Sequence, residues 1–103
     1  MAEEILYTIL VEFDGGTYIS QEYADNPFIA VRYWSRNETS NGFPMQLNES
    51  QRIELQQDFF NADLVPIDGL INVWCDSTTI DDKLLLLNCI QTDKIILDYQ
   101  NDF

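Results

Sequence analysis

One stretch of the sequence, Leu70–Thr92, constrains the fold more than any other. It contains two apolar runs separated by a polar break at Asp81-Asp82, which is typical of a β-hairpin. Four leucines follow one another at positions 84–87, and in a strand they must alternate between the two faces of a sheet. The stretch therefore predicts a central hairpin that is largely covered on both faces, with the rest of the chain packed against it.

A second hairpin is predicted near the N-terminus. Apolar residues alternate through Ile5–Phe13, which is the period of a strand, and Asp14–Gly16 follows as a turn that leads into a returning strand. A three-residue loop with a bulge would place Val11 opposite Ile19 and gather the apolar residues on one face. A two-residue loop would place Val11 opposite Tyr18 or Ser20 and divide the apolar residues between both faces. We expect the three-residue loop.

The first of two predicted helices begins at Pro27, whose missing N–H is no loss in the first turn. Asp25 or Asn26 can cap it, and it extends to residue 36 or 37. The spacing places Ala30, Val31 and Trp34 toward the sheet. Alternation of Ile29, Val31 and Tyr33 leaves a strand as the rival interpretation, and the cap and proline favour the helix.

The second helix follows a loop predicted over residues 37–44, where Asn, Gly, Ser and Pro cluster. Asn48 and Gln51 have the spacing of a capping box, and the helix extends to about Asn61. Its expected inward residues are Ile53, Phe59 and Phe60, and Leu55 and Phe59 are expected to stack one turn apart.

These elements predict one domain, residues 1–103, of the α+β class. We expect an antiparallel sheet of four to five strands with both helices on one face, in the order β-β-α-α-β-β-β. The last strand is expected over Lys94–Tyr99, where apolar residues alternate, with a short C-terminal helix as the alternative. Trp34 and Trp74 lie within apolar runs and are expected in the core.

The net charge of the chain limits the kinds of partner that it can bind. The 103 residues include 18 Asp and Glu against 5 Lys and Arg, a formal net charge of −13. Such a surface repels nucleic acid and anionic lipid, and no apolar run is long enough to span a membrane. The acidic start at Glu3-Glu4, where a signal peptide would be basic, predicts a cytoplasmic protein.

The residue types argue against catalysis. The chain contains no histidine, which excludes Ser-His and Cys-His nucleophilic pairs and ordinary zinc enzymes. Gly15-Gly16 is too short for a phosphate-binding loop, and the spaced aspartates of a calcium loop are absent. We therefore expect no enzyme activity, no cofactor and no metal.

Cys75 and Cys89 lie on the two strands of the central hairpin. If Asp81-Asp82 is a two-residue loop, Cys75 faces Asn88 and the two sulfur atoms lie on opposite sides of the sheet. A three-residue loop places Cys75 directly opposite Cys89, close enough for a disulfide. We expect two buried free thiols, and a redox role is the alternative.

Several motifs resemble a group of short bacterial proteins that have no assigned activity. They are Gly15-Gly16-Thr17-Tyr18-Ile19-Ser20-Gln21, the Asn26-Pro27 helix start, Pro66-Ile67-Asp68-Gly69-Leu70-Ile71-Asn72-Val73-Trp74-Cys75 and Lys83-Leu84-Leu85-Leu86-Leu87-Asn88. The resemblance covers most of the chain except the middle loop and the second helix. It implies one compact domain and no particular mechanism.

The leading hypothesis is a small acidic protein that neutralises or regulates a basic protein such as a nuclease or toxin, in the manner of an immunity protein, an antitoxin or a phage inhibitor. An acidic surface is steered quickly toward a basic one. The candidate partner-binding residues are Asp14, Asp76, Asp81 and Asp82. The alternatives are a small enzyme or redox protein that uses surface carboxylates or Cys75 and Cys89, and a homo-oligomeric (for example dimeric) structural protein.

Overall fold

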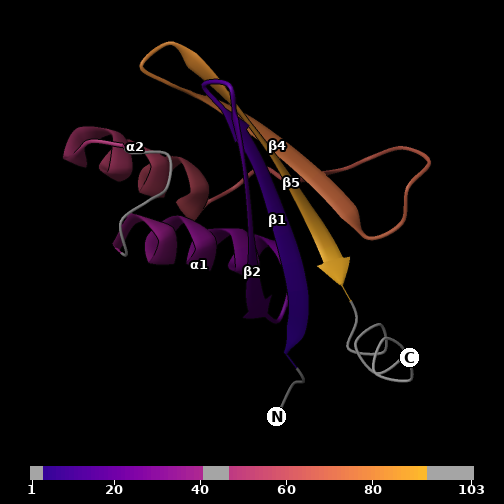
Figure 1. Cartoon of the computed structure of the whole chain (residues 1–103). Coiled ribbons are helices and arrows are strands. Elements are labelled where there is room, and N and C mark those ends of the chain that lie inside the picture. Colours follow the sequence, from indigo (N-terminus) through magenta and orange to yellow (C-terminus); the bar gives the residue numbers. More distant parts are fainter. Residues whose placement is uncertain (1–3, 41–46, 93–103) are drawn as a thin grey trace, which may run out of the picture.

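The computed structural model describes residues 4–40 and 47–92. Within these ranges, five strands and two helices follow one another as β1 (Ile5–Phe13), β2 (Gly16–Ala24), α1 (Pro27–Ser40), α2 (Glu49–Phe60), β3 (Val65–Pro66), β4 (Val73–Ile80) and β5 (Lys83–Thr92). The strands form one antiparallel sheet in the order β2-β1-β5-β4-β3. Both helices lie on the same side of this sheet (Figure 1).

The predicted α+β class, the strand count and the placement of both helices on one face are confirmed. The fifth strand of the sheet is β3, which the sequence did not reveal because it is only two residues long and contains Pro66. The strand predicted over Lys94–Tyr99 lies outside the described residues.

The helix-facing side of the sheet, called the covered face below, carries the core. Its centre is the pairing of β1 with β5, in which Ile9 lies opposite Cys89, Val11 opposite Leu87, and Phe13 opposite Leu85. All six of these side chains are buried. Since residues of one parity share a face, the alternation predicted for β1 is the pattern that builds this core.

The predicted three-residue loop of the first hairpin is wrong. Val11 lies opposite Tyr18, and the loop is the two-residue turn Asp14-Gly15, closed by Phe13 and Gly16. Both turn residues have positive φ, 49° and 82°, as a type I′ turn requires. This turn suits the right-handed twist of the flanking strands, and the register places Ile19 on the side away from the helices.

The first helix is confirmed and is longer than expected, because residues 37–40, predicted as loop, continue it. Asn26 accepts a hydrogen bond from the backbone N–H of Ile29 at 2.9 Å, as a cap does. Ala30, Val31 and Trp34 are buried as predicted.

The predicted capping box of α2 is also confirmed, with Asn48 and Gln51 each accepting from the other's backbone N–H. Leu55 and Phe59 are buried, and the Phe59 ring meets that of Trp34 edge-on at 5.7 Å. The inward placement of Ile53 and Phe60 is wrong, since both are about half exposed. The buried stripe of this helix is one residue wide per turn, and Phe60 lies beneath the Arg32 guanidinium instead.

The central hairpin is formed by β4 and β5 and begins at Val73, three residues later than Leu70. Its loop is Asp81-Asp82, again with positive φ at both residues. Cys75 therefore lies opposite Asn88, and the two thiols are free and on opposite sides of the sheet. The predicted burial is correct for Cys89 and wrong for Cys75, which is only partly buried. Trp74 is only half-buried at the edge of the core, where it contacts Tyr7 edge-on.

Candidate functional site

The side of the sheet that faces away from the helices, called the open face below, is unusually apolar. No described helix lies over it (Figure 1). By strand parity its apolar side chains are those of Leu6, Leu10, Ile19, Tyr23, Leu84, Leu86, Ile90, Val73, Cys75 and Val65. The polar side chains on the same face are those of Thr8, Glu12, Thr17, Gln21, Ser77, Thr79, Asn88 and Thr92. Ile19 is 66% exposed and Leu84 56%. A large exposed apolar patch on a small protein is typical of an interaction surface.

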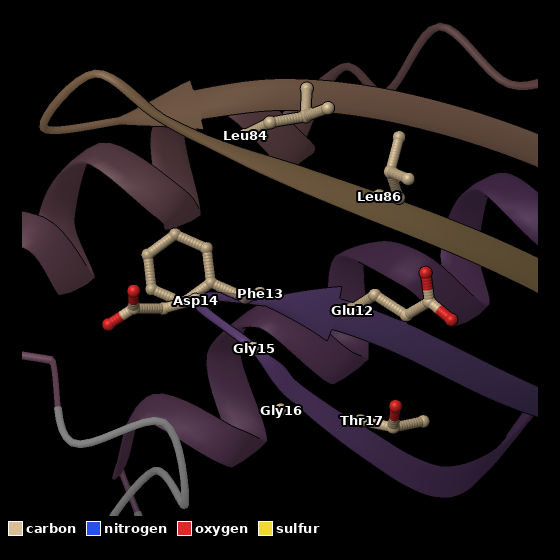
Figure 2. Close-up of a pocket in the computed structure, with 8 residues that line it drawn as sticks. All are labelled: Glu12, Phe13, Asp14, Gly15, Gly16, Thr17, Leu84 and Leu86. Atoms are coloured by element: carbon tan, nitrogen blue, oxygen red, sulfur yellow. The ribbon is translucent and has the colours of Figure 1, made fainter.

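A cavity of about 360 Å³ lies on this face at the end where the two hairpin loops meet. Figure 2 shows side chains from three neighbouring strands around it: Thr17 from β2, Glu12 from β1, and Leu84 and Leu86 from β5. Glu12 pairs with Thr17 on one side and with Leu86 on the other. The Asp14–Gly16 turn completes the lining. We call Glu12, Asp14, Thr17, Leu84 and Leu86 the tip site.

The two hairpin loops are joined by side chains of opposite charge. Lys83 Nζ lies 3.1 Å from Asp14 Oδ2, in an ion pair whose two side chains are more than half exposed. Asp81 accepts a hydrogen bond from the Gln51 side chain of α2. Asp82 is exposed beside it. Three of the four predicted partner-binding aspartates, Asp14, Asp81 and Asp82, therefore gather at one end of the molecule.

The fourth predicted aspartate, Asp76, lies away from this end. Its Oδ1 accepts from the backbone N–H of Ser77 at 2.7 Å, and its Oδ2 accepts from the backbone N–H of Asp63 at 3.2 Å. These bonds hold the chain that leaves α2 against β4. The geometry gives Asp76 a part in the fold, on the covered face rather than at the tip site.

Sequence reasoning missed Glu12, the carboxylate residue that pairs with Leu86. The Asp14-Gly15 dipeptide, which strongly favours a two-residue hairpin turn, was a signal for part of the site, because that register places Glu12 opposite Thr17 on the open face. The three-residue loop that we expected would place Glu12 opposite Tyr18 instead. The pairing of Glu12 with Leu86 is set by β1 and β5, and no local signal in the first hairpin predicts it.

A second hollow of about 390 Å³ lies along the β4–β5 part of the sheet beside the short β3 strand, and residues of both faces line it. Leu86 lines both hollows, and Cys75 lines this one. Cys89 lies on the covered face, where burial raises its pKa from 9.0 to about 12. Because the sheet separates the two sulfur atoms, these cysteines cannot form a disulfide with each other.

Within residues 4–40 and 47–92, no three Cys, Asp or Glu side chains are grouped so that they could hold a metal ion. Neither described helix is long and apolar enough to cross a membrane. Comparison of the chain with protein-family models, curated proteins and solved structures finds no match in any of the three. The functional argument therefore depends on the geometry of the site alone.

Proposed function

We propose that the chain is a non-catalytic protein-binding domain that receives a basic segment of a partner protein at the tip site and so neutralises or regulates that partner. The observation that carries the proposal is one cavity that combines two leucine side chains with a carboxylate, in Leu84, Leu86 and Glu12. Lys and Arg side chains have the matching chemistry, because an apolar stem ends in a cation. The stem would lie on the leucines, and the cation would reach Glu12.

The charge around the cavity supports a basic partner. Four carboxylates, those of Glu12, Asp14, Asp81 and Asp82, lie at this end of the molecule together with one ammonium group, that of Lys83. The chain as a whole carries −13. Charge of one sign concentrated near a site raises the rate at which an oppositely charged partner arrives. Proteins that bind nucleic acid, including nuclease toxins, present the basic surface that such a site would receive.

The two leucines of the tip site would supply the binding free energy that charge alone does not. Exposed ion pairs contribute little to affinity because they are screened by salt and cost side-chain entropy. Leu84 and Leu86 are 56% and 40% exposed, so that a partner side chain laid over them removes apolar surface from water. We therefore expect a partner segment in which basic and apolar residues are neighbours, and weak binding of a segment that is only basic.

A labelled peptide of alternating lysine and leucine tests the proposal by fluorescence anisotropy at low and high salt. In one control peptide glutamate replaces lysine, which tests the role of charge. In the other control peptide serine replaces leucine, which tests the role of apolar contact. The parent protein should bind the lysine–leucine peptide best and lose affinity as salt rises. Failure to bind it at either salt concentration contradicts the proposal.

Glu12→Gln should weaken that binding about tenfold or more, since a hydrogen bond to a charged group contributes about 1.5–3 kcal/mol. The matched control is Glu4→Gln, which removes the same charge from an exposed position directly before β1, at the end of that strand opposite Glu12. The control should bind within about twofold of the parent, because salt screens charges beyond about 8 Å. Equal weakening by both variants would show that net charge, and not the tip site, attracts the peptide.

A further inference from the structure

The outer edge of β2 is the least protected part of the sheet. β2 ends the strand order, its nine residues pair with β1 without a bulge, and none of them is proline or lysine. Proteins usually shield edge strands with such residues, with bulges or with very short strands, because unpaired N–H and C=O groups can pair with another chain. The opposite edge is shielded in this way: β3 is two residues long and includes Pro66.

The register of the first hairpin identifies the unpaired groups. The pair that closes a two-residue turn, here Phe13 and Gly16, is hydrogen-bonded, and such pairs alternate along an antiparallel ladder. The backbone groups of the intervening residues of β2 therefore point away from β1. These residues are Thr17, Ile19, Gln21 and Tyr23.

We infer that β2 pairs antiparallel with β2 of a second copy of the chain, with Ser20 on the two-fold axis. In this register Thr17 lies opposite Tyr23 of the second copy, and Ile19 lies opposite Gln21 of the second copy. All four outward-facing residues of each copy are then paired. A shift by two residues leaves one of them without a partner on each copy, so that the chosen register satisfies the most backbone groups. The contact is self-complementary, as a two-fold interface must be.

The side chains around this axis agree with the pairing. Ile19 is 66% exposed and Tyr23 47%, and in this register Ile19 of each copy is a diagonal neighbour of Ile19 and Tyr23 of the other. On the other face, the buried Oγ of Ser20 has no hydrogen-bond partner among the described residues. Facing serines can bond across an antiparallel pair, and rotation about χ1 would bring each hydroxyl toward its counterpart.

Charge favours a second copy over a basic protein at this edge. Among residues 17–23, which pair across the axis, only Glu22 is charged, in a chain whose net charge is −13. In this register Glu22 lies opposite Tyr18 of the second copy, so that two acidic molecules can approach here without placing like charges opposite each other. A basic segment would find one carboxylate along this edge. The inference does not rest on the tip site, with which the paired edge shares Thr17. Glu12, Leu84 and Leu86 of the tip site lie on β1 and β5, away from this edge.

Sedimentation of the protein at concentrations from about 1 µM to 1 mM tests the dimer. Dissociation constants in this range correspond to association free energies of about −8 to −4 kcal/mol. Gln21→Pro removes one outward N–H and leaves the bonds to β1 in place, since proline is tolerated where an edge N–H faces solvent. Gln21→Ala is the matched control, because it loses the same 3.0 Å hydrogen bond from Nε2 to Thr8 Oγ1 and keeps the N–H. The parent and Gln21→Ala should dimerise, and Gln21→Pro should be monomeric. A monomeric parent throughout, or equal dimer fractions for the two variants, would overturn the inference.

Should Gln21→Pro fail to fold by circular dichroism, Ile19→Lys serves in its place, with Leu84→Lys as its control on the open face away from the edge. Only Ile19→Lys should abolish the dimer, and loss in both variants would indicate stacking of open faces instead. Hydrogen exchange gives a second readout in the parent. The amides of Thr17, Ile19, Gln21 and Tyr23 should become protected as concentration rises, and protection that is independent of concentration would contradict the pairing.

Discussion

The two faces of the sheet are both rich in large apolar side chains, yet they have different physical roles. On the covered face, Leu85 and Leu87 are buried beneath the helices. On the open face, their neighbours Leu84 and Leu86 remain largely exposed and line the tip site. A run of four leucines thus supplies the core with one pair and the surface with the other. The comparison teaches that apolarity alone does not identify a core, because burial also requires another layer to pack against.

Adjacent leucines offer the sharpest test of this difference. Leu87→Ala should destabilise the fold by about 2–5 kcal/mol, since it removes a fully enclosed side chain and leaves a cavity. Leu86→Ala should cost less than about 1 kcal/mol, because its side chain is already 40% exposed. Urea unfolding at neutral pH measures both. Similar losses for the two variants would show that the open face is covered in solution.

The cysteines provide the next test, since one lies on each face. Burial raises the pKa of Cys89 to about 12, against 9.0 in an exposed thiol. Between these values the unfolded chain releases the proton that the folded chain retains. The stabilising contribution is therefore complete below pH 9 and is lost progressively as the pH rises toward 12. Tyr7, whose pKa is also raised, mainly by burial, changes stability in the same direction.

Cys89→Ala removes the thiol contribution, so that its free energy of unfolding should fall less steeply above pH 9 than that of the parent. Cys75→Ala serves as the matched control, because it is the same substitution made on the open face. Denaturant titrations from pH 8 to pH 11 compare the three proteins. Parallel curves for the parent and Cys89→Ala would contradict the burial of this thiol.

Much of the fold was predictable because local signals and burial agreed. Alternation in β1, the Asn48–Gln51 capping box and the cap before Pro27 each identified an element correctly. The register of the first hairpin was harder to predict. The assumption that apolar residues gather on one face led to the wrong loop in the first hairpin, because here both faces are apolar and hydrophobic pattern could not distinguish them.

The conformational preference of the turn residues decided the register of the first hairpin instead, and part of the candidate site depended on that register. Asp14-Gly15 adopts the positive φ angles of a two-residue turn, which places Glu12 opposite Thr17. The position of Glu12 beside Leu86 comes from the pairing of β1 with β5. The grouping of Asp14 with Asp81 and Asp82 was also beyond sequence reasoning, since it arises from the pairing of β1 with β5. Exposure of Ile53 and Phe60 had a similar origin, because α2 contacts the molecule along a narrow stripe.

The last prediction has the smallest expected effect, and it distinguishes the conformational role of the Asp81-Asp82 loop from the role of its charge. Asp81 and Asp82 both have positive φ, a region that Asn tolerates nearly as well as Asp and that other residues with a Cβ adopt at a cost of about 1–2 kcal/mol each. Replacing both with Asn should change the free energy of unfolding by less than about 0.5 kcal/mol. Replacing both with Ala should destabilise the fold measurably.

Binding should respond differently from stability. Both double variants remove two carboxylates from the end that holds the tip site, so each should bind the lysine–leucine peptide more slowly than the parent and with a weaker salt dependence. The Asn pair is the decisive variant, because it loses charge while the turn is kept. Unchanged association rates at low and high salt would remove these two aspartates from the proposed site and leave Glu12 and Asp14 as its charged residues. A large loss of stability in the Asn pair would instead show that the Asp81 bond to Gln51 supports the covered face.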